Sequence, residues 1–291
     1  MSDRSLRWYH RLYVGMQYLL PQHLLSALMF RVTRIRWRPL KDLLIRRAIR
    51  HFGIDMNEAR EPDPTAYGNF NEFFTRALRA GSRLVSEHHA SIACPADGTL
   101  SQLGEIEKGR IFQAKGQDYS LLELLGGRAD WAERFDGGAF ATIYLSPRDY
   151  HRVHMPIAGD LREMIHVPGR LFSVNPVTTS LVPRLFARNE RVVCLFEGAA
   201  GPMAVILVGA IFVGSMDTVW AGQVTPASAR EPSRRYGGKS AVRLEKGAEM
   251  GRFNMGSTVI LLFPRGRVRW DGSLQPDDQV RMGQRIGDAS A

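Results

Sequence analysis

The sequence contains few cysteines, since only Cys94 and Cys194 occur among its 291 residues. Two cysteines cannot form a disulfide framework or a four-cysteine metal site, so a reducing compartment and two small buried side chains are the simplest interpretation. Long hydrophobic runs are missing as well. The most apolar stretch, residues 204–214, is far shorter than the ~20 residues of a spanning helix and is typical of a buried strand. The chain is therefore not predicted to cross a membrane.

Neither a secretory signal nor a low-complexity tract is visible. Residues 1–4 lead directly into aromatic side chains and arginines, without a compact apolar segment and a small-residue cleavage site. No strong internal repeat occurs. Hydrophobic residues make up 44% of the chain, enough for a substantial core. We therefore expect one large cytoplasmic domain, or one domain with an appendage.

Acidic residues are almost absent from the amino-terminal region. The first 52 residues hold eleven Lys and Arg but only Asp3 and Asp42, and so contribute +9 to the chain's net charge of +10. Pro21 should end a first helix in this region, and Pro39 and Gly53 should open and close a third. Apolar residues recur at helical spacing in three stretches, which are Leu6, Tyr9, Tyr13, Met16 and Leu20, then Leu24, Leu25, Leu28, Met29 and Val32, and finally Leu40, Leu43 and Leu44.

A basic amphipathic region of this kind is typical of proteins that bind an anionic bilayer surface. Trp37, between Arg36 and Arg38, suits such an interface. Two other interpretations remain open: a helical cap on the body with a solvated basic face, and nucleic-acid binding, although the body is not basic and has no recognition motif. We predict residues 1–60 as a basic amphipathic helical membrane-association region. It would hold the protein at the cytoplasmic side of the cell membrane as a peripheral protein.

The remaining residues, 61–291, show the pattern of a β-rich body. A linker is predicted at residues 61–64 and a short helix at residues 71–78. From about Ser91, short β-rich runs separated by glycine indicate an α+β fold, with a mostly antiparallel, β-sandwich-like body behind N-terminal amphipathic helices. The clearest runs are residues 140–145, 192–196, 204–213 and 258–263.

A polar connection at residues 225–238 ends in two glycines and predicts an exposed loop. Arg234 and Arg235 in this loop are either solvated or in contact with a lipid headgroup or the membrane.

The pair Gly256 and Ser257, followed by the apolar residues 259–263, supports two interpretations. Taken alone, it is a turn that enters a buried strand. Alternatively, the peptide bond between the two residues could be broken by the serine itself. Gly256 leaves its own carbonyl free of Cβ bulk, and the Ser257 hydroxyl is a latent nucleophile that needs a base.

Several other segments favour the second interpretation when they are read together. Residues 94–99 (CPADGT), 144–156 (YLSPRDYHRVHMP) and 250–258 (MGRFNMGST) resemble the phosphatidylserine decarboxylase family, whose members are pyruvoyl-dependent enzymes made as proenzymes. The resemblance covers nearly the whole chain from about Asn69. It continues in the family's order through residues 167–176, 189–196 and 218–222. Met255 stands where many bacterial members have leucine, a change that keeps volume and polarity.

The resemblance implies a self-cleavage triad of Asp97, His154 and Ser257. Ser257 would attack the Gly256 carbonyl, His154 would accept its proton, and Asp97 would orient the histidine. Residues 1–256 would become the β chain and residues 257–291 the α chain, with Ser257 converted to the pyruvoyl group and Schiff-base site. His151 matches the family histidine of the decarboxylation step, as the proton donor. Ser173 corresponds to a residue expected near the substrate headgroup.

The body, residues 61–291, is accordingly predicted to be catalytic. The implied reaction converts phosphatidylserine to phosphatidylethanolamine and CO2 in phospholipid biosynthesis, with a covalent pyruvoyl cofactor. The two chains of one precursor would stay associated, and the resemblance suggests a homodimer of αβ units. His151 and His154 have the spacing of a metal-binding pair, but no third and fourth ligand follow, so no metal is predicted.

Two rival functions remain open. One is a pyruvoyl decarboxylase that acts on a soluble amino acid. The other is a non-catalytic membrane-surface protein, because residues 283–287 resemble the end of biotinyl- or lipoyl-carrier folds. None of the lysines of the chain stands in the methionine-flanked position that such carriers modify.

Overall fold

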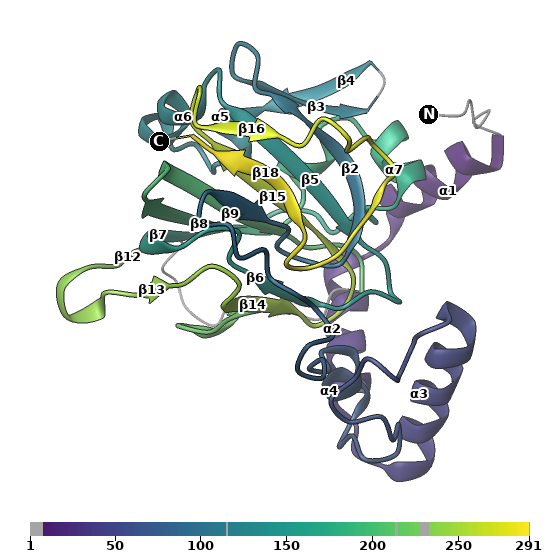
Figure 1. The fold of residues 1–291 in the computed structure, drawn as a ribbon. Coiled ribbons are helices and arrows are strands. Elements are labelled where there is room, and N and C mark those ends of the chain that lie inside the picture. The colour runs from purple at the N-terminus through teal and green to yellow at the C-terminus, as the bar shows by residue number, and fades with distance from the viewer. Residues whose placement is uncertain (1–7, 115, 213–214, 227–232, 291) are drawn as a thin grey trace.

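The computed structural model describes residues 8–114, 116–212, 215–226 and 233–290. Arg4, Leu6 and Arg7 of the predicted first helix lie outside these residues, as do the centre of the predicted loop and the end of the most apolar run. The chain has an α+β fold, as predicted: N-terminal helices lie along one side of a body of mostly antiparallel strands (Figure 1).

The N-terminal helices begin and end close to the predicted positions. Pro21 separates the first two helices, and Gly53 ends the third in the left-handed conformation, with φ 66°. The fourth helix is shorter than predicted, because the chain after Thr75 pairs its backbone with residues 58–60 instead. The four helices are α1 (Trp8–Leu19), α2 (Gln22–Val32), α3 (Arg38–Phe52) and α4 (Phe70–Phe74).

A nine-stranded sheet forms the centre of the body, and every strand pair in it is antiparallel. Its order is β12-β7-β8-β9-β15-β5-β2-β17, with β13 also paired to β7. The strands are β12 (Ser233–Arg235), β7 (Gly159–Val167), β8 (Arg191–Gly198), β9 (Gly201–Val208), β15 (Ser257–Phe263), β5 (Ala139–Leu145), β2 (Gly98–Glu105), β17 (Gln279–Val280) and β13 (Arg243–Leu244). The predicted strands β5, β8, β9 and β15 are thus neighbours in the middle of this sheet.

Smaller sheets and short helices surround the central sheet (Figure 1). A four-stranded sheet contains β11 (Gly222–Thr225), β10 (Met216–Thr218), β14 (Glu249–Phe253) and β6 (Arg152–His154). A three-stranded sheet contains β1 (Ser91–Ala93), β18 (Arg285–Ala289) and β16 (Val268–Trp270), while β3 (Arg110–Ala114) pairs with β4 (Gln117–Ser120). The remaining helices are α5 (Leu121–Leu124), α6 (Ala129–Phe135), α7 (Pro176–Leu181), α8 (Leu185–Arg188) and the 3-10 turn η1 (Gly238–Ser240).

Two details differ from the sequence-based expectations. The predicted loop at residues 225–238 contains β12, which adds to the edge of the central sheet through β7, although its three side chains are exposed as expected. Strand β9 ends at Val208, earlier than the apolar run predicts. Cys94 and Cys194 are buried free thiols, as predicted.

The hydrophobic core has a main part within the body and a smaller helical cluster, formed by Ile45, Ala48, Ile54, Phe70, Phe73 and Phe74. Met255 packs against this helical cluster. The residue that precedes Gly256 therefore contacts the N-terminal helices, although it is distant from them in the sequence.

Candidate active site

Ser257 is the first residue of β15, and it is fully buried. It pairs with Leu145 of β5, while the next residue pairs with Val208 of β9 on the other side. The Ser257 Oγ has no hydrogen-bond partner among the described residues. Because buried polar atoms are nearly always paired, an unpaired buried hydroxyl requires an explanation. One such explanation is that the hydroxyl acts as a nucleophile in a reaction that has not yet occurred.

Gly256 is not required by packing. A Cβ atom added here would have only the Leu145 carbonyl oxygen within contact range, at 3.7 Å, an ordinary van der Waals distance. The fold therefore tolerates a side chain at this position. The glycine is better explained by a need for open access to its carbonyl carbon.

His154, at the end of β6, is a buried neutral base. Its Nδ1 lies 2.8 Å from the Gly247 carbonyl oxygen, which can only accept, so Nδ1 carries the proton and donates. The Nε2 then holds a lone pair and accepts from the Tyr150 hydroxyl at 3.1 Å. Burial lowers the pKa of His154. It also raises the pKa of Tyr150 to about 12, so that the tyrosine stays a donor.

Asp97 is close to His154 but is bonded to other groups. The His154 backbone N–H donates to the Pro95 carbonyl, which fixes β6 beside this loop. Both carboxylate oxygens of Asp97 accept from Arg83, with Nε 2.9 Å from Oδ1 and Nη2 2.5 Å from Oδ2. The Met282 backbone N–H donates to Oδ1 as well, at 2.8 Å. Within the described residues, the Asp97 carboxylate is thus bonded to Arg83 and not to the His154 ring.

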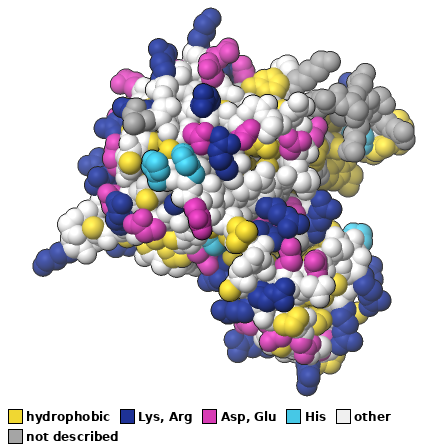
Figure 2. Space-filling model, viewed as in Figure 1, with side chains coloured by type: hydrophobic (Ala, Val, Ile, Leu, Met, Phe, Trp, Pro, Cys, Tyr) yellow, Lys and Arg dark blue, Asp and Glu magenta, His cyan; other side chains and the backbone are white. Residues whose placement is uncertain are grey.

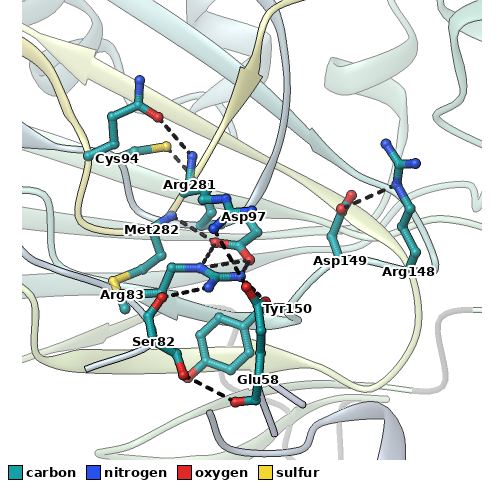
Figure 3. Close-up of polar contacts among 12 residues, drawn as sticks. Glu58, Ser82, Arg83, Cys94, Asp97, Arg148, Asp149, Tyr150, Arg281 and Met282 are labelled. Carbon is teal, nitrogen blue, oxygen red and sulfur yellow. Dashed lines mark hydrogen bonds and ion pairs between the residues drawn. The ribbon is translucent and has the colours of Figure 1, made fainter. Parts of the chain in front are cut away.

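Arg83 joins two acidic residues in one buried network. Figure 3 shows its guanidinium group between Asp97 and Glu58, whose Oε2 lies 2.7 Å from Nη2. The hydrogen bond to Asp97 is the main reason why the pKa of Arg83 is raised. Arg148 and Asp149 form a looser pair to one side, at 3.8 Å.

His151 is fully buried and has a ring nitrogen without a partner. Its Nδ1 donates to the Asp149 carbonyl at 2.8 Å, whereas Nε2 has no hydrogen-bond partner within the described chain. The ring packs against Phe74 of α4, with centroids 4.1 Å apart. Burial lowers the pKa of His151 to about 3, and the positive charge of Arg76 acts in the same direction. His151 is therefore neutral, with a free lone pair on Nε2.

The sheet register brings these elements to one end of β15. Ser257 faces Leu145, the last residue of β5, and the loop that follows Leu145 leads directly to His151. The Phe253 backbone N–H donates to the His151 carbonyl at 3.0 Å, which holds the end of β14 against this loop. On the far side of β5, Thr99 of β2 pairs with Tyr144, so the Asp97 loop begins two strands away from Ser257.

Ser173 lies on the other side of β15. Its backbone N–H donates to the Gln17 side chain of α1 at 2.8 Å. Asn189 donates to the carbonyls of Phe172 and Gly209, and so links this loop to the end of β9. No hydrogen bond among the described residues connects Ser173 with either histidine. The expected contact with a substrate headgroup stays a prediction.

A cavity of about 280 Å³ opens between the helical region and the body, beside Asp97. It is lined partly by charged side chains that the sequence did not single out, among them Glu58, Arg76, Arg83 and Arg281. Arg76 and Arg83 lie outside the three segments of the site and are separated from them in the sequence. Tyr150 stands within one of those segments, and only its contact with His154 reveals its importance.

No group of three or more His, Cys, Asp or Glu side chains in the described part of the chain is arranged to hold a metal ion. Within the same residues, no helix is long and apolar enough to span a membrane.

Comparison with known proteins shows a match over most of the chain. The model of the family described as phosphatidylserine decarboxylase matches residues 70–288, and a second family model, described only as PSD, matches residues 12–53. A phosphatidylserine decarboxylase proenzyme of Azotobacter vinelandii is 57% identical over 282 residues, which cover 96% of this chain and 99% of that protein. Proenzymes of the same name from Stutzerimonas stutzeri and Bordetella avium are 56% and 55% identical, over 96% and 95% of this chain and 95% and 94% of theirs.

These matches first define a class: the chain is an enzyme, a carboxy-lyase of phospholipid metabolism. The match over residues 70–288 makes the assignment specific, since it includes Asp97, both histidines and Ser257. The chain belongs to the phosphatidylserine decarboxylase family.

Proposed function

We propose that this chain is a proenzyme that cuts itself between Gly256 and Ser257, and that the product converts phosphatidylserine to phosphatidylethanolamine and CO2. The observation that carries this proposal is the buried, unpaired Ser257 Oγ at the start of a central strand, beside the loop of two neutral histidines. The hydroxyls of Thr258 and Thr142 are also buried without a partner among the described residues. Ser257 differs from them because it directly follows Gly256.

The cut begins with the Ser257 hydroxyl. Its Oγ bonds to the Gly256 carbonyl carbon, the peptide C–N bond breaks, and the proton of the hydroxyl ends on the freed amine, which leaves an ester. Loss of the Ser257 Cα proton then breaks the Cβ–O bond and releases the Gly256 carboxylate. The residue left at position 257 is an enamine, which becomes an imine when a proton moves from its nitrogen to Cβ. The imine then takes up water and loses ammonia. Residues 1–256 and 257–291 become separate chains.

His154 is the base that this first step needs. The hydrogen bond from Nδ1 to the Gly247 carbonyl leaves the lone pair on Nε2. In the structure, this lone pair accepts from the Tyr150 hydroxyl. Cleavage requires Nε2 to exchange the tyrosine for the Ser257 hydroxyl. The carboxylate of Asp97 has to stabilise the protonated ring once the proton has moved, as in other triads.

A pyruvoyl group at position 257 fits the surroundings. The Ser257 hydroxyl makes no hydrogen bond to a described residue, so its loss leaves no described polar partner unsatisfied, and the position is fully buried. When bound there, the group supplies the electron sink that loss of carbon dioxide requires.

His151 is suited to carry a proton within the buried site. It starts neutral, so its Nε2 can accept the proton that the substrate ammonium must release before its nitrogen can react. The same nitrogen can then return a proton to the substrate α carbon after carbon dioxide has left. His151 therefore acts first as a base and then as the predicted proton donor.

The intact mass of the denatured protein tests the cleavage directly. We expect two chains that separate after Gly256, the smaller with an N-terminal pyruvoyl group instead of serine, and one uncut chain for Ser257→Ala. A single chain in both samples would overturn the proposal. Decarboxylation of phosphatidylserine in mixed micelles, with free serine as the alternative substrate, then separates the lipid enzyme from the soluble amino-acid rival.

We also propose that the N-terminal helices bind a membrane surface. The residues of α1 and α2 that face the body are largely polar: Gln17 and Gln22 accept from the backbone of Ser173 and Leu171, and Ser26 accepts from that of Phe212. Val14 is buried in the main core, but many of the large apolar side chains of these helices point outward. The most exposed are Trp8, Leu12, Met16, Leu19, Leu24 and Leu28, and Leu19 is 87% exposed.

Exposed apolar rows on helices of this kind are rare in proteins that remain in water. Positive charge lies on the two helices that follow: Figure 2 shows Lys and Arg side chains over the part of the surface that holds α3 and α4. Apolar burial and attraction to anionic lipids would act together at a bilayer surface. This arrangement favours membrane contact over a helical cap, because a cap would bury its apolar face.

Sedimentation of the processed protein without lipid also tests the predicted homodimer of αβ units.

A further inference from the structure

Arg76 is a buried cation without an anionic partner. The residue is only 5% exposed, and its one hydrogen bond among the described residues runs from Nη2 to the Arg148 carbonyl, at 3.3 Å. Its Nε and Nη1 have no hydrogen-bond partner in the described part of the chain. The guanidinium carbon lies 5.6 Å from the centre of the Phe73 ring, which gives weak compensation. Buried arginines are almost always paired, so this one is prepared for a ligand.

The other charged groups around Arg76 already have partners. It lines the cavity beside Asp97, in which Arg83 is bonded to Asp97 and Glu58. Asp149 accepts from the backbone and side chain of Ser146, at 2.7 Å each. Arg281 lies 3.5 Å from Glu58 at the exposed side of the cavity. Asp97, Glu58 and Asp149 act on the charge of Arg76 from a distance, but no described carboxylate forms a direct ion pair with it.

The segment of Arg76 runs directly along the loop that holds His151. Phe74 packs on the His151 ring, the Thr75 carbonyl accepts from Arg152 at 2.9 Å, and Arg76 itself donates to the Arg148 carbonyl. These three successive residues therefore contact the loop on both sides of His151. An anion held by Arg76 would lie beside the proposed proton carrier.

We propose that Arg76 binds the phosphate group of the substrate, a phosphodiester in the lipid headgroup. This inference rests on the proposed function. A guanidinium group offers two parallel N–H donors to a phosphate, either from Nε and Nη2 or from Nη1 and Nη2. Nη2 of Arg76 donates only one hydrogen bond among the described residues, and Nε and Nη1 donate none, so one such parallel pair is unused. The substrate carboxylate is the less suitable partner. A cation on the carboxylate would stabilise the state before carbon dioxide leaves and so would oppose the reaction.

A phosphate does not change during decarboxylation, so its binding should affect KM far more than kcat. We expect Arg76→Gln in the processed enzyme to raise KM for phosphatidylserine in mixed micelles by ~10- to 100-fold, the range of a lost charge-assisted pair, with kcat changed less than about threefold. The Ki of glycerophosphoethanolamine, which has the phosphodiester but no carboxylate, should rise by the same factor. Arg76→Lys keeps the charge but not the paired donors. Its KM and Ki should lie between those of the wild type and those of Arg76→Gln.

Arg79→Gln is the matched control, because Arg79 is exposed, lies in the same segment and is not among the residues of the cavity. It should change neither constant by more than about twofold, which separates a site at Arg76 from a general effect of positive charge. If Arg76→Gln does not fold, as judged by its melting temperature and the extent of cleavage, Arg76→Lys carries the test alone.

Unchanged KM and Ki in Arg76→Gln, or in a folded Arg76→Lys when the first variant fails, would overturn the inference. An Arg76-dependent inhibition by inorganic phosphate, with no inhibition by glycerophosphoethanolamine, would also overturn it and assign the site to free phosphate. Wild-type decarboxylation of phosphatidylserine is measured in the same series. Its absence would refute the proposed function itself, a result distinct from failure of the Arg76 site.

Discussion

Arg83 and Asp97 form a bidentate ion pair that is almost completely buried, with exposed side-chain fractions of 6% and 9%. The pair connects the segment after the N-terminal helices to the loop before β2. The loop that holds Asp97 also contacts the base proposed for self-cleavage, because the Pro95 carbonyl accepts from the His154 backbone N–H. The carboxylate cannot leave this position without losing charge-assisted hydrogen bonds.

Arg83→Gln should slow self-cleavage strongly. Removal of one partner of a buried ion pair leaves the other without compensation and costs about 3–5 kcal/mol of stability, and here it also frees the Asp97 carboxylate to move. The fraction of cut chain over time, by denaturing electrophoresis, measures the effect. Glu58→Gln removes only the outer partner, which is 30% exposed, and should have a much smaller effect. Equal cleavage rates for the wild type, Arg83→Gln and Glu58→Gln would contradict this prediction.

Substitutions of the two histidines should block different steps of the reaction sequence. His154→Ala should leave the chain uncut, because it removes the proposed base, whose ring is held by Gly247 and Tyr150. His151→Gln can keep a donor to the Asp149 carbonyl and should still cleave, but it should decarboxylate at least ~100-fold more slowly. Mass spectrometry and CO2 release measure the two steps separately. An uncut His151→Gln protein would move His151 into the cleavage step.

Acid should destabilise the fold through the buried histidines. His151 has its pKa lowered from 6.5 to about 3, so above pH 6.5 it is neutral in both the folded and the unfolded chain and contributes nothing. As pH falls below 6.5, the unfolded chain gains a proton that the folded chain does not, and stability decreases until about pH 3. At pH 5 this amounts to about 2 kcal/mol for one such group.

Ser257→Ala provides the uncut reference for that measurement. Between pH 7.5 and pH 5, its free energy of unfolding should fall by about 2 kcal/mol more than that of the double variant with His151→Gln. Identical pH dependence in the two proteins would show that His151 takes up its proton in the folded state.

Membrane binding should depend on the exposed leucines of α1 and α2, whose replacement should not affect the stability of the fold. The combined change Leu12→Gln, Leu19→Gln and Leu28→Gln should weaken binding to anionic vesicles at least ~10-fold without lowering the melting temperature, because all three side chains are exposed. Leu84→Gln, at an 82% exposed leucine outside these helices, is the matched control. Unchanged co-sedimentation of the triple variant would refute the membrane proposal. Removal of residues 1–52 is a poorer test, since Ile45 and Ala48 belong to the helical cluster.

The elements that the sequence predicts well have local causes. Residues of β5, β8 and β15 are buried on both faces of the central sheet, so their runs are continuously apolar and visible as such. Pro21 and Gly53 end helices through their own backbone restrictions. Strand β12 is different, because its three exposed residues show no apolar alternation and its pairing depends on β7.

The site is harder to predict than the fold because its contacts are non-local. Ser257, His151 and His154 can be proposed from their motifs, but Arg83 reaches Asp97 only through the tertiary structure. Gln17 illustrates the same limit: a polar residue of α1 is buried because its partner is the backbone of Ser173, 156 positions away. No periodicity in the helix sequence contains that information.

Strand β15 lies between β9 and β5, with backbone pairing along both edges and every residue buried. If the chain is cut after Gly256, this strand becomes the new amino terminus of the small chain while its hydrogen bonds remain in place. The two products are then a fragment pair that shares one cooperative core, and neither can leave without unfolding the other. The α chain made separately would keep the pairing of β16 with β18 but would lack β5 and β9, the two neighbours of β15 in the central sheet.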